Sequence, residues 1–187
     1  MGILAIVKKL PNYATDIKQN LLDIFEEQKS NLEKKELFGI SLAICYALGH
    51  EQLLNGVRAE AKLYLEEVDA SACKVAATMM AMTNVYYSFT DNAPDYKALE
   101  SKLTMPSLKN PGVPSKELDL YCLAVSILHS CHHCTMVHTK KLIESGMSKE
   151  SIRDVARIAA VLKAAMTALE IERMRSYDFV VRDASMN

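Results

Sequence analysis

The distribution of proline most constrains how this 187-residue chain can fold. Four of its five prolines, Pro94, Pro106, Pro111 and Pro114, lie between residues 90 and 115, and only Pro11 lies elsewhere. Because proline ends or kinks a helix, long helices can form on either side of this segment but not within it. Apolar residues on both sides recur at helical spacing, and no strand-like alternation stands out. We therefore expect an all-α fold.

The apolar composition agrees with this prediction and sets the domain plan. Half of the residues are apolar but only 6% are aromatic, and Trp is absent, so Ala, Leu, Ile, Val and ten Met must form the core. Such residues favour helices over β-sandwiches. We expect one domain over residues 1–187: a helical half (1–90), a connector (91–115), a second helical half (116–175) and a short tail (176–187). The tail is interpreted as a frayed end, with a docking arm as the alternative.

Turn and capping residues predict where the helices begin and end. The expected helices are segments around 21–25 and 37–48, then 51–67, 70–87, 116–129, 131–144 and 149 to about 173, with one short helix near 96–103. Asp69, Ser130 and Ser148 are the expected N-caps of three of them, because short polar side chains accept backbone N–H groups there. Gly146 is expected to close the helix that starts at Ser130.

A weak internal repeat relates the two halves. A shift of 81 residues aligns Glu36 and Leu37 with Glu117 and Leu118, and continues through Leu42 and Ala43. In this register His50 and Leu53 stand where the second half has Cys131 and Cys134. The pattern predicts a duplicated helical unit that carries a thiol pair in one copy only.

Charge and hydropathy exclude several functional classes. The 22 basic and 23 acidic residues give a net charge of -1, without a basic patch for nucleic acid or an anionic membrane. No signal peptide is indicated and no apolar run is long enough to span a bilayer, so we expect neither secretion nor membrane insertion. Five cysteines point to a reducing cytoplasm, where Cys45, Cys73 and Cys122 are expected as buried free thiols.

The motif that carries chemistry is Cys131-His132-His133-Cys134, followed by His138. On a helix, Cys131 and Cys134 lie one turn apart, and His138 lies one turn beyond Cys134. With Ser130 as N-cap, both thiols would occupy the first turn, where free N–H groups and the helix dipole favour a thiolate. A dithiol beside a base can reduce a peroxide, since one sulfur forms a sulfenic acid and the other condenses with it to a disulfide.

Other interpretations of the motif remain open. Cys131, Cys134 and His138 with His132 or His133 would supply four metal ligands, although structural zinc sites usually join two separated pairs. Haem attachment requires a histidine directly after the second cysteine, where Thr135 stands, and a thioredoxin-like motif requires neighbouring strands. The alternative to an enzyme is therefore a non-catalytic helical module for redox sensing or metal-binding assembly.

The sequence resembles the AhpD-type alkyl hydroperoxidases of the carboxymuconolactone decarboxylase-like superfamily. The shared motif is an acidic residue, eleven residues of any type, and then Cys-x-x-Cys-x-x-x-His. Three further segments share this resemblance, which spans nearly the whole chain: Leu10–Ala14, Met82–Tyr87 and Asn110–Pro114. It implies an all-α fold with two similar halves and a homo-oligomer, expected to be a trimer because the family commonly assembles as trimers or larger rings. It also implies reduction of hydroperoxides and recycling of the peroxiredoxin AhpC. Electrons would come from the lipoyl group of a lipoylated acyltransferase-type protein, with no tightly bound cofactor or metal.

The same resemblance assigns roles to the site residues. Cys134 would be the peroxidatic cysteine that forms the sulfenic acid, and Cys131 its resolving partner and proton donor, so that a Cys131–Cys134 disulfide forms. His138 would relay the proton and His133 would support the site. The acidic relay residue falls at Asp119, where the family normally has Glu. Because Asp is shorter by one methylene, a bridging water or Glu117 could serve in its place.

Overall fold

The computed structural model describes residues 2–27 and 29–175, and these fold into α-helices joined by turns and by one long connector. The α-helices are α1 (Ile3–Lys9), α2 (Thr15–Phe25), α3 (Lys34–Leu48), α4 (Glu51–Ala61), α5 (Glu67–Asn92), α6 (Ser115–Leu128), α7 (His132–Glu144) and α8 (Lys149–Arg175). Short 3-10 helices occur at Asn12–Ala14, Pro94–Tyr96 and Pro106–Leu108. No strand occurs among the described residues, so the predicted all-α fold is confirmed.

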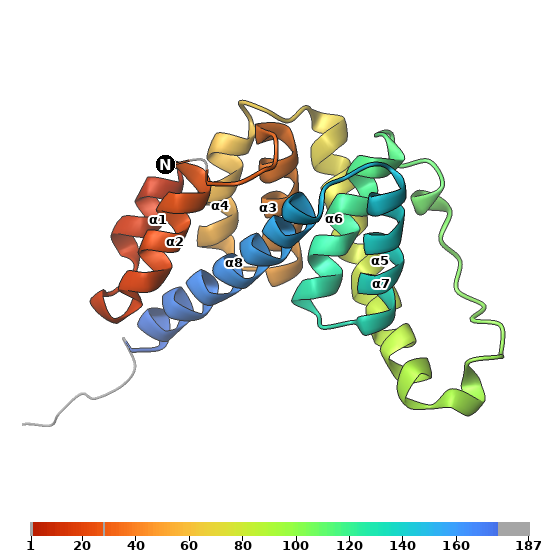
Figure 1. Cartoon of the computed structure of the whole chain (residues 1–187). Coiled ribbons are helices and arrows are strands. Elements are labelled where there is room, and N and C mark those ends of the chain that lie inside the picture. The colour runs from red at the N-terminus through yellow and green to blue at the C-terminus, as the bar shows by residue number, and fades with distance from the viewer. Residues whose placement is uncertain (1, 28, 176–187) are drawn as a thin grey trace, which may run out of the picture.

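The core is built around α3 and α6, which pack against each other. α5 and α8 each contact both of these central helices, while α4 packs on α3 and α7 packs on α6. Figure 1 shows α1 and α2 at one end of the molecule, beside α4 and α8, and the connector between α5 and α6 looping around the opposite end. Both central helices are buried along most of their length, which explains why their apolar residues exceed the single stripe of a surface helix.

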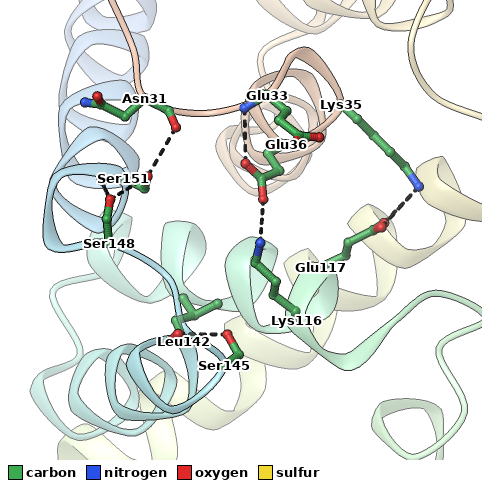
Figure 2. Close-up of polar contacts among 10 residues, drawn as sticks. All are labelled: Asn31, Glu33, Lys35, Glu36, Lys116, Glu117, Leu142, Ser145, Ser148 and Ser151. Carbon is green, nitrogen blue, oxygen red and sulfur yellow. Dashed lines mark hydrogen bonds and ion pairs between the residues drawn. The ribbon is translucent and has the colours of Figure 1, made fainter.

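Two crossed ion pairs join positions that the internal repeat makes equivalent (Figure 2). Lys35 Nζ lies 3.1 Å from a carboxylate oxygen of Glu117, and Lys116 Nζ lies 3.0 Å from one of Glu36. These four residues are two pairs of equivalent positions under the shift of 81, since 35 + 81 = 116 and 36 + 81 = 117. The lysine at the start of each of these two helices, α3 and α6, therefore forms an ion pair with the glutamate at the start of the other.

The starts of α4 and α7 show the same relationship. His50 is the N-cap of α4, and its Nδ1 accepts a hydrogen bond from the Leu53 N–H at 3.1 Å. Cys131 is the N-cap of α7, and its sulfur accepts from the Cys134 N–H at 3.4 Å. The predicted register that pairs His50 with Cys131 thus corresponds to one shared capping geometry.

Several predicted boundaries are wrong for identifiable reasons. The helix expected over 51–67 ends at Ala61, and a new helix starts at Glu67, because Glu66 and Asp69 form a reciprocal capping box. Asp69 is therefore the third residue of α5, and Glu66 is its N-cap. The connector lacks the short helix expected near 96–103 and has two 3-10 turns that each begin at a proline.

Other local predictions have mixed outcomes. The capping role of Ser148 is confirmed, because its hydroxyl accepts from the Ser151 N–H at 3.0 Å. Gly146 follows α7 with a φ of +85°, as expected for a helix-ending glycine. Helix α1 was not predicted, and the tail from 176 to 187 lies outside the described residues. None of the described helices combines the length and apolar character that crossing a bilayer requires.

Candidate active site

The first cysteine of the motif lies at the boundary between a turn and a helix. Ser130 has a φ of +56°, in the left-handed region, and Cys131 follows as the N-cap of α7. The prediction that Ser130 caps this helix is therefore wrong, and Cys131 takes that position with its own sulfur. Cys134 is the third helical residue, and its N–H points at the Cys131 sulfur. The two thiols are consequently adjacent, but only Cys134 belongs to the helical turn.

Both sulfurs are shielded from solvent by the helices around them. Cys131 is fully buried and Cys134 is 4% exposed. Burial raises the pKa of the Cys134 thiol, and the neighbouring Cys131 raises it further, whereas a hydrogen bond with the Thr83 side chain of α5 lowers it. Burial therefore opposes the thiolate that the helix start was expected to favour at Cys134. Ionisation of this thiol requires a base.

A histidine–carboxylate pair stands one turn beyond Cys134. His138 Nδ1 lies 2.8 Å from Asp119 Oδ1, and both side chains are almost buried. Lys141 Nζ contacts the same carboxylate oxygen at 3.2 Å. Burial raises the pKa of Asp119, but hydrogen bonds from His138 and Lys141 outweigh it, so the pKa lies below its usual value. An ionised Asp119 holds the proton of His138 on Nδ1 and leaves Nε2 as the proton acceptor.

The predicted alternative, Glu117, lies elsewhere. Its carboxylate pairs with Lys35 of α3, at the contact between the two halves (Figure 2). Glu117 and Asp119 are two residues apart on α6, so their side chains point in different directions. Asp119 points toward α7 and Glu117 toward α3. The shorter Asp119 reaches His138 directly, without a bridging water. Asp119 is therefore the carboxylate that the fold brings to His138.

The other histidines of the motif differ in their surroundings. His132 is exposed, as predicted. His133 is half-buried and stacks on Tyr87 of α5, with ring centroids 4.5 Å apart and ring planes inclined by 14°. Its Nδ1 lies 4.0 Å from Asp91 Oδ1. His133 therefore ties the start of α7 to the end of α5, next to the buried thiols.

A cavity of about 260 Å³ opens beside the histidine–carboxylate pair. Its walls come from the connector, α6 and α7. They comprise Leu108, Lys109, Pro111, Val113, Ser115, Leu118, Asp119, Cys122, His138 and Lys141. This chamber of mixed polarity places Pro111 of the connector in the same cavity wall as His138. The connector thus forms one wall of the site as well as joining the two halves.

Sequence reasoning missed the residues that α5 and the middle of α7 contribute. Thr83, Tyr87 and Asp91 recur every four residues, so they lie on one face of α5. That spacing was the available signal. Lys141 was also missed, although it lies three residues after His138. Within the described ranges, no three His, Cys, Asp or Glu side chains converge as ligands for a metal ion.

Comparisons with known proteins place this site in a family. Residues 94–172 match the carboxymuconolactone decarboxylase family. The alkyl hydroperoxide reductase AhpD of Coxiella burnetii (strain Dugway 5J108-111) is 41% identical over 157 residues, covering 82% of this chain and 89% of the relative. The proteins of the same name from Rhodospirillum centenum and Methylocella silvestris are 35% and 34% identical, covering 92% and 95% of this chain and 92% and 99% of their own lengths. With this similarity along most of its length, the chain belongs to the AhpD family of alkyl hydroperoxide reductases.

Proposed function

We propose that the protein is an antioxidant peroxidase that reduces alkyl hydroperoxides through Cys131 and Cys134. The observation that carries the proposal is the adjacency of two thiols at the start of α7 with a His138–Asp119 pair one turn away. The name shared by the similar proteins, alkyl hydroperoxide reductase, supports the same activity.

The first step oxidises Cys134. Because burial raises its pKa, Cys134 reacts only after the Nε2 of His138 has taken its proton, and Asp119 stabilises the resulting imidazolium. The thiolate attacks the terminal oxygen of the hydroperoxide, so that an S–O bond forms and the O–O bond breaks. Cys131 gives its proton to the departing alkoxide, which leaves as an alcohol. Cys134 is now a sulfenic acid and Cys131 a thiolate.

The second step closes the disulfide. The Cys131 thiolate attacks the sulfur of the sulfenic acid, and the hydroxide leaves as water with the proton held by His138. One dithiol and one hydroperoxide thus give one disulfide, one alcohol and one water. The N-cap position suits the resolving cysteine, because Cys131 has extended rather than helical backbone angles and can approach Cys134 without unwinding the helix.

The cycle needs a reductant and a cellular context. We propose that a dihydrolipoyl group on a lipoylated acyltransferase-type protein returns two electrons and two protons to the disulfide, becoming the lipoyl disulfide. We further propose that the protein recycles the peroxiredoxin AhpC by the same dithiol exchange, and that it works in a reducing cytoplasm. His133 would support the site through its stacking on Tyr87.

We also propose a homo-oligomer, with a trimer as the family resemblance implies. Large apolar side chains are exposed on α5 and just after it, including Val85 (73%), Phe89 (51%) and Leu99 (62%). Such a group of exposed apolar residues is typical of an association surface. Light scattering at micromolar concentration tests this, since a monomer would contradict it.

The activity test uses full-length reduced protein and an alkyl hydroperoxide with dihydrolipoamide as electron donor. Wild-type protein should consume the peroxide, and Cys134→Ser should not. Cys45→Ser is the matched control, because this cysteine is buried in α3 and lies outside the motif. No consumption by wild-type protein would contradict the proposal and favour a redox-sensing or metal-binding module.

A further inference from the structure

The contact of Lys141 with Asp119 has a consequence for His138. Asp119 Oδ1 accepts from His138 Nδ1 at 2.8 Å and from Lys141 Nζ at 3.2 Å, so one oxygen serves both groups. Lys141 lies one turn after His138 on α7, and its side chain is 53% exposed. It therefore covers the solvent side of a pair that is otherwise almost buried.

Few other ionisable groups face this pair. Lys109 of the connector and Cys122 of α6 line the same cavity, and Cys134 lies one turn earlier on α7. Burial raises the pKa of Cys122 to about 12, so this thiol carries no charge near neutral pH. Asp91 of α5 acts on Cys134 from the other side of the motif. Lys141 is thus the cation in direct contact with the carboxylate.

This arrangement balances the charges while His138 is neutral. The Lys141 ammonium and the Asp119 carboxylate sum to zero, so a proton on His138 gives the group a net positive charge. Without Lys141 the negative charge of Asp119 would have no balancing cation. Protonation of His138 would then make the group neutral and would be favoured. We propose that Lys141 is a positioning residue that neutralises Asp119 and thereby keeps His138 in the neutral form that can accept a proton.

The role of Lys141 in catalysis rests on the proposed function, because His138 needs to be neutral only if it takes the proton of Cys134. Its electrostatic effect can be measured without turnover. Side-chain ¹⁵N spectra of the reduced, full-length protein follow the titration of His138, with signals assigned by their loss in His138→Gln. In Lys141→Gln the titration midpoint should rise by about 0.5 to 1 pH unit, a shift reduced by the partial exposure of the lysine.

Three comparisons separate this effect from a general loss of charge. Lys140→Gln removes the same charge one residue earlier, where the side chain is 78% exposed and lies 3.9 Å from Glu144. It should leave the midpoint unchanged. Lys141→Arg should titrate like the wild type. Raising the salt to about 1 M should shrink the difference between Lys141→Gln and wild type, because the screening length falls to about 3 Å.

The outcomes decide the two proposals separately. If Lys141→Gln titrates like wild type, or if Lys140→Gln shifts as far, the positioning role is overturned. If the midpoint rises as expected, the acidic limb of hydroperoxide reduction should move to higher pH by the same amount. A rise in the midpoint together with no peroxide consumption by the wild type would support the electrostatic role and refute the peroxidase function.

Discussion

Replacing Asp119 by Asn should slow hydroperoxide reduction about 100-fold near neutral pH. Two unit charges about 4 Å apart attract by roughly 4 kcal/mol at an effective dielectric constant of 20. The small exposure of both side chains and the hydrogen bond that an amide oxygen retains reduce this to about 2 to 3 kcal/mol. Since about 1.4 kcal/mol changes a rate tenfold, the loss lies at the lower end of the range for general acid–base groups.

The pH dependence of this loss follows from the shifted pKa values. The pKa of Asp119 is lowered, so its carboxylate contributes fully above the usual value of such groups and is lost only as the pH falls through the lowered pKa. Ionisation of the carboxylate itself should therefore add no pH dependence to the deficit of Asp119→Asn across neutral pH. Partial recovery should begin only as the pH approaches the pKa of Cys134, about 12, where this thiol ionises without a base.

Single-turnover consumption of an alkyl hydroperoxide by reduced protein measures the effect, because it avoids the electron donor. Asp119→Glu should retain activity, since the carboxylate remains and the family resemblance implies Glu at this position. Glu117→Gln is the matched control: it removes a carboxylate two residues away that pairs with Lys35. Wild-type rates in Asp119→Asn, or inactivity in Glu117→Gln, would refute the assignment of Asp119 as the relay carboxylate.

Three further predictions concern the thiols and the contact between the halves. Peroxide should produce a Cys131–Cys134 disulfide detectable by mass spectrometry, and Cys131→Ser should leave a sulfenic acid that dimedone traps at Cys134; trapping elsewhere would contradict the assigned roles. Thr83→Val should slow single-turnover reduction by about 3- to 10-fold, because the Thr83 side chain lowers the pKa of Cys134, and an unchanged rate would exclude that effect. Lys116→Gln should lower the free energy of unfolding by no more than about 1 kcal/mol in urea titrations, because its pair with Glu36 is partly exposed; a loss above about 3 kcal/mol would contradict this.

The fold could be predicted largely because its signals are local and repeated. Proline placement and apolar spacing separate the helices from the connector, and a shift of 81 residues predicts the equivalent positions of Lys35 and Lys116. Their crossed pairing with Glu117 and Glu36 needed the structure, because it depends on how α3 and α6 approach each other. Helix ends were less predictable: Asp69 is a good N-cap residue, but its reciprocal bond with Glu66 moves the start of α5 by several residues.

The candidate site was predictable where its residues share one helix. The spacing of Cys134 and His138 on α7 follows directly from helical geometry. The contribution of α5 does not, because the effect of Thr83 on the pKa of Cys134 depends on tertiary packing. The same holds for the pKa of Cys134: the helix start can be read from the sequence, whereas the burial that raises this pKa depends on the surrounding helices. The shared oxygen of Asp119 likewise appears only when α6 and α7 are placed together.

Because the Cys131 sulfur accepts the Cys134 amide hydrogen bond, the resonance of that amide should respond to oxidation of the thiol pair. A disulfide would draw this sulfur toward the Cys134 side chain and away from the Cys134 amide, so the amide resonance should move between the reduced and oxidised forms. The Leu53 amide has the equivalent position in the other half, where the cap is the imidazole of His50, which has no redox chemistry of its own. One backbone spectrum of the unmodified protein therefore contains both the signal and its internal reference, and the redox state can be followed without a label, a dye or a substitution.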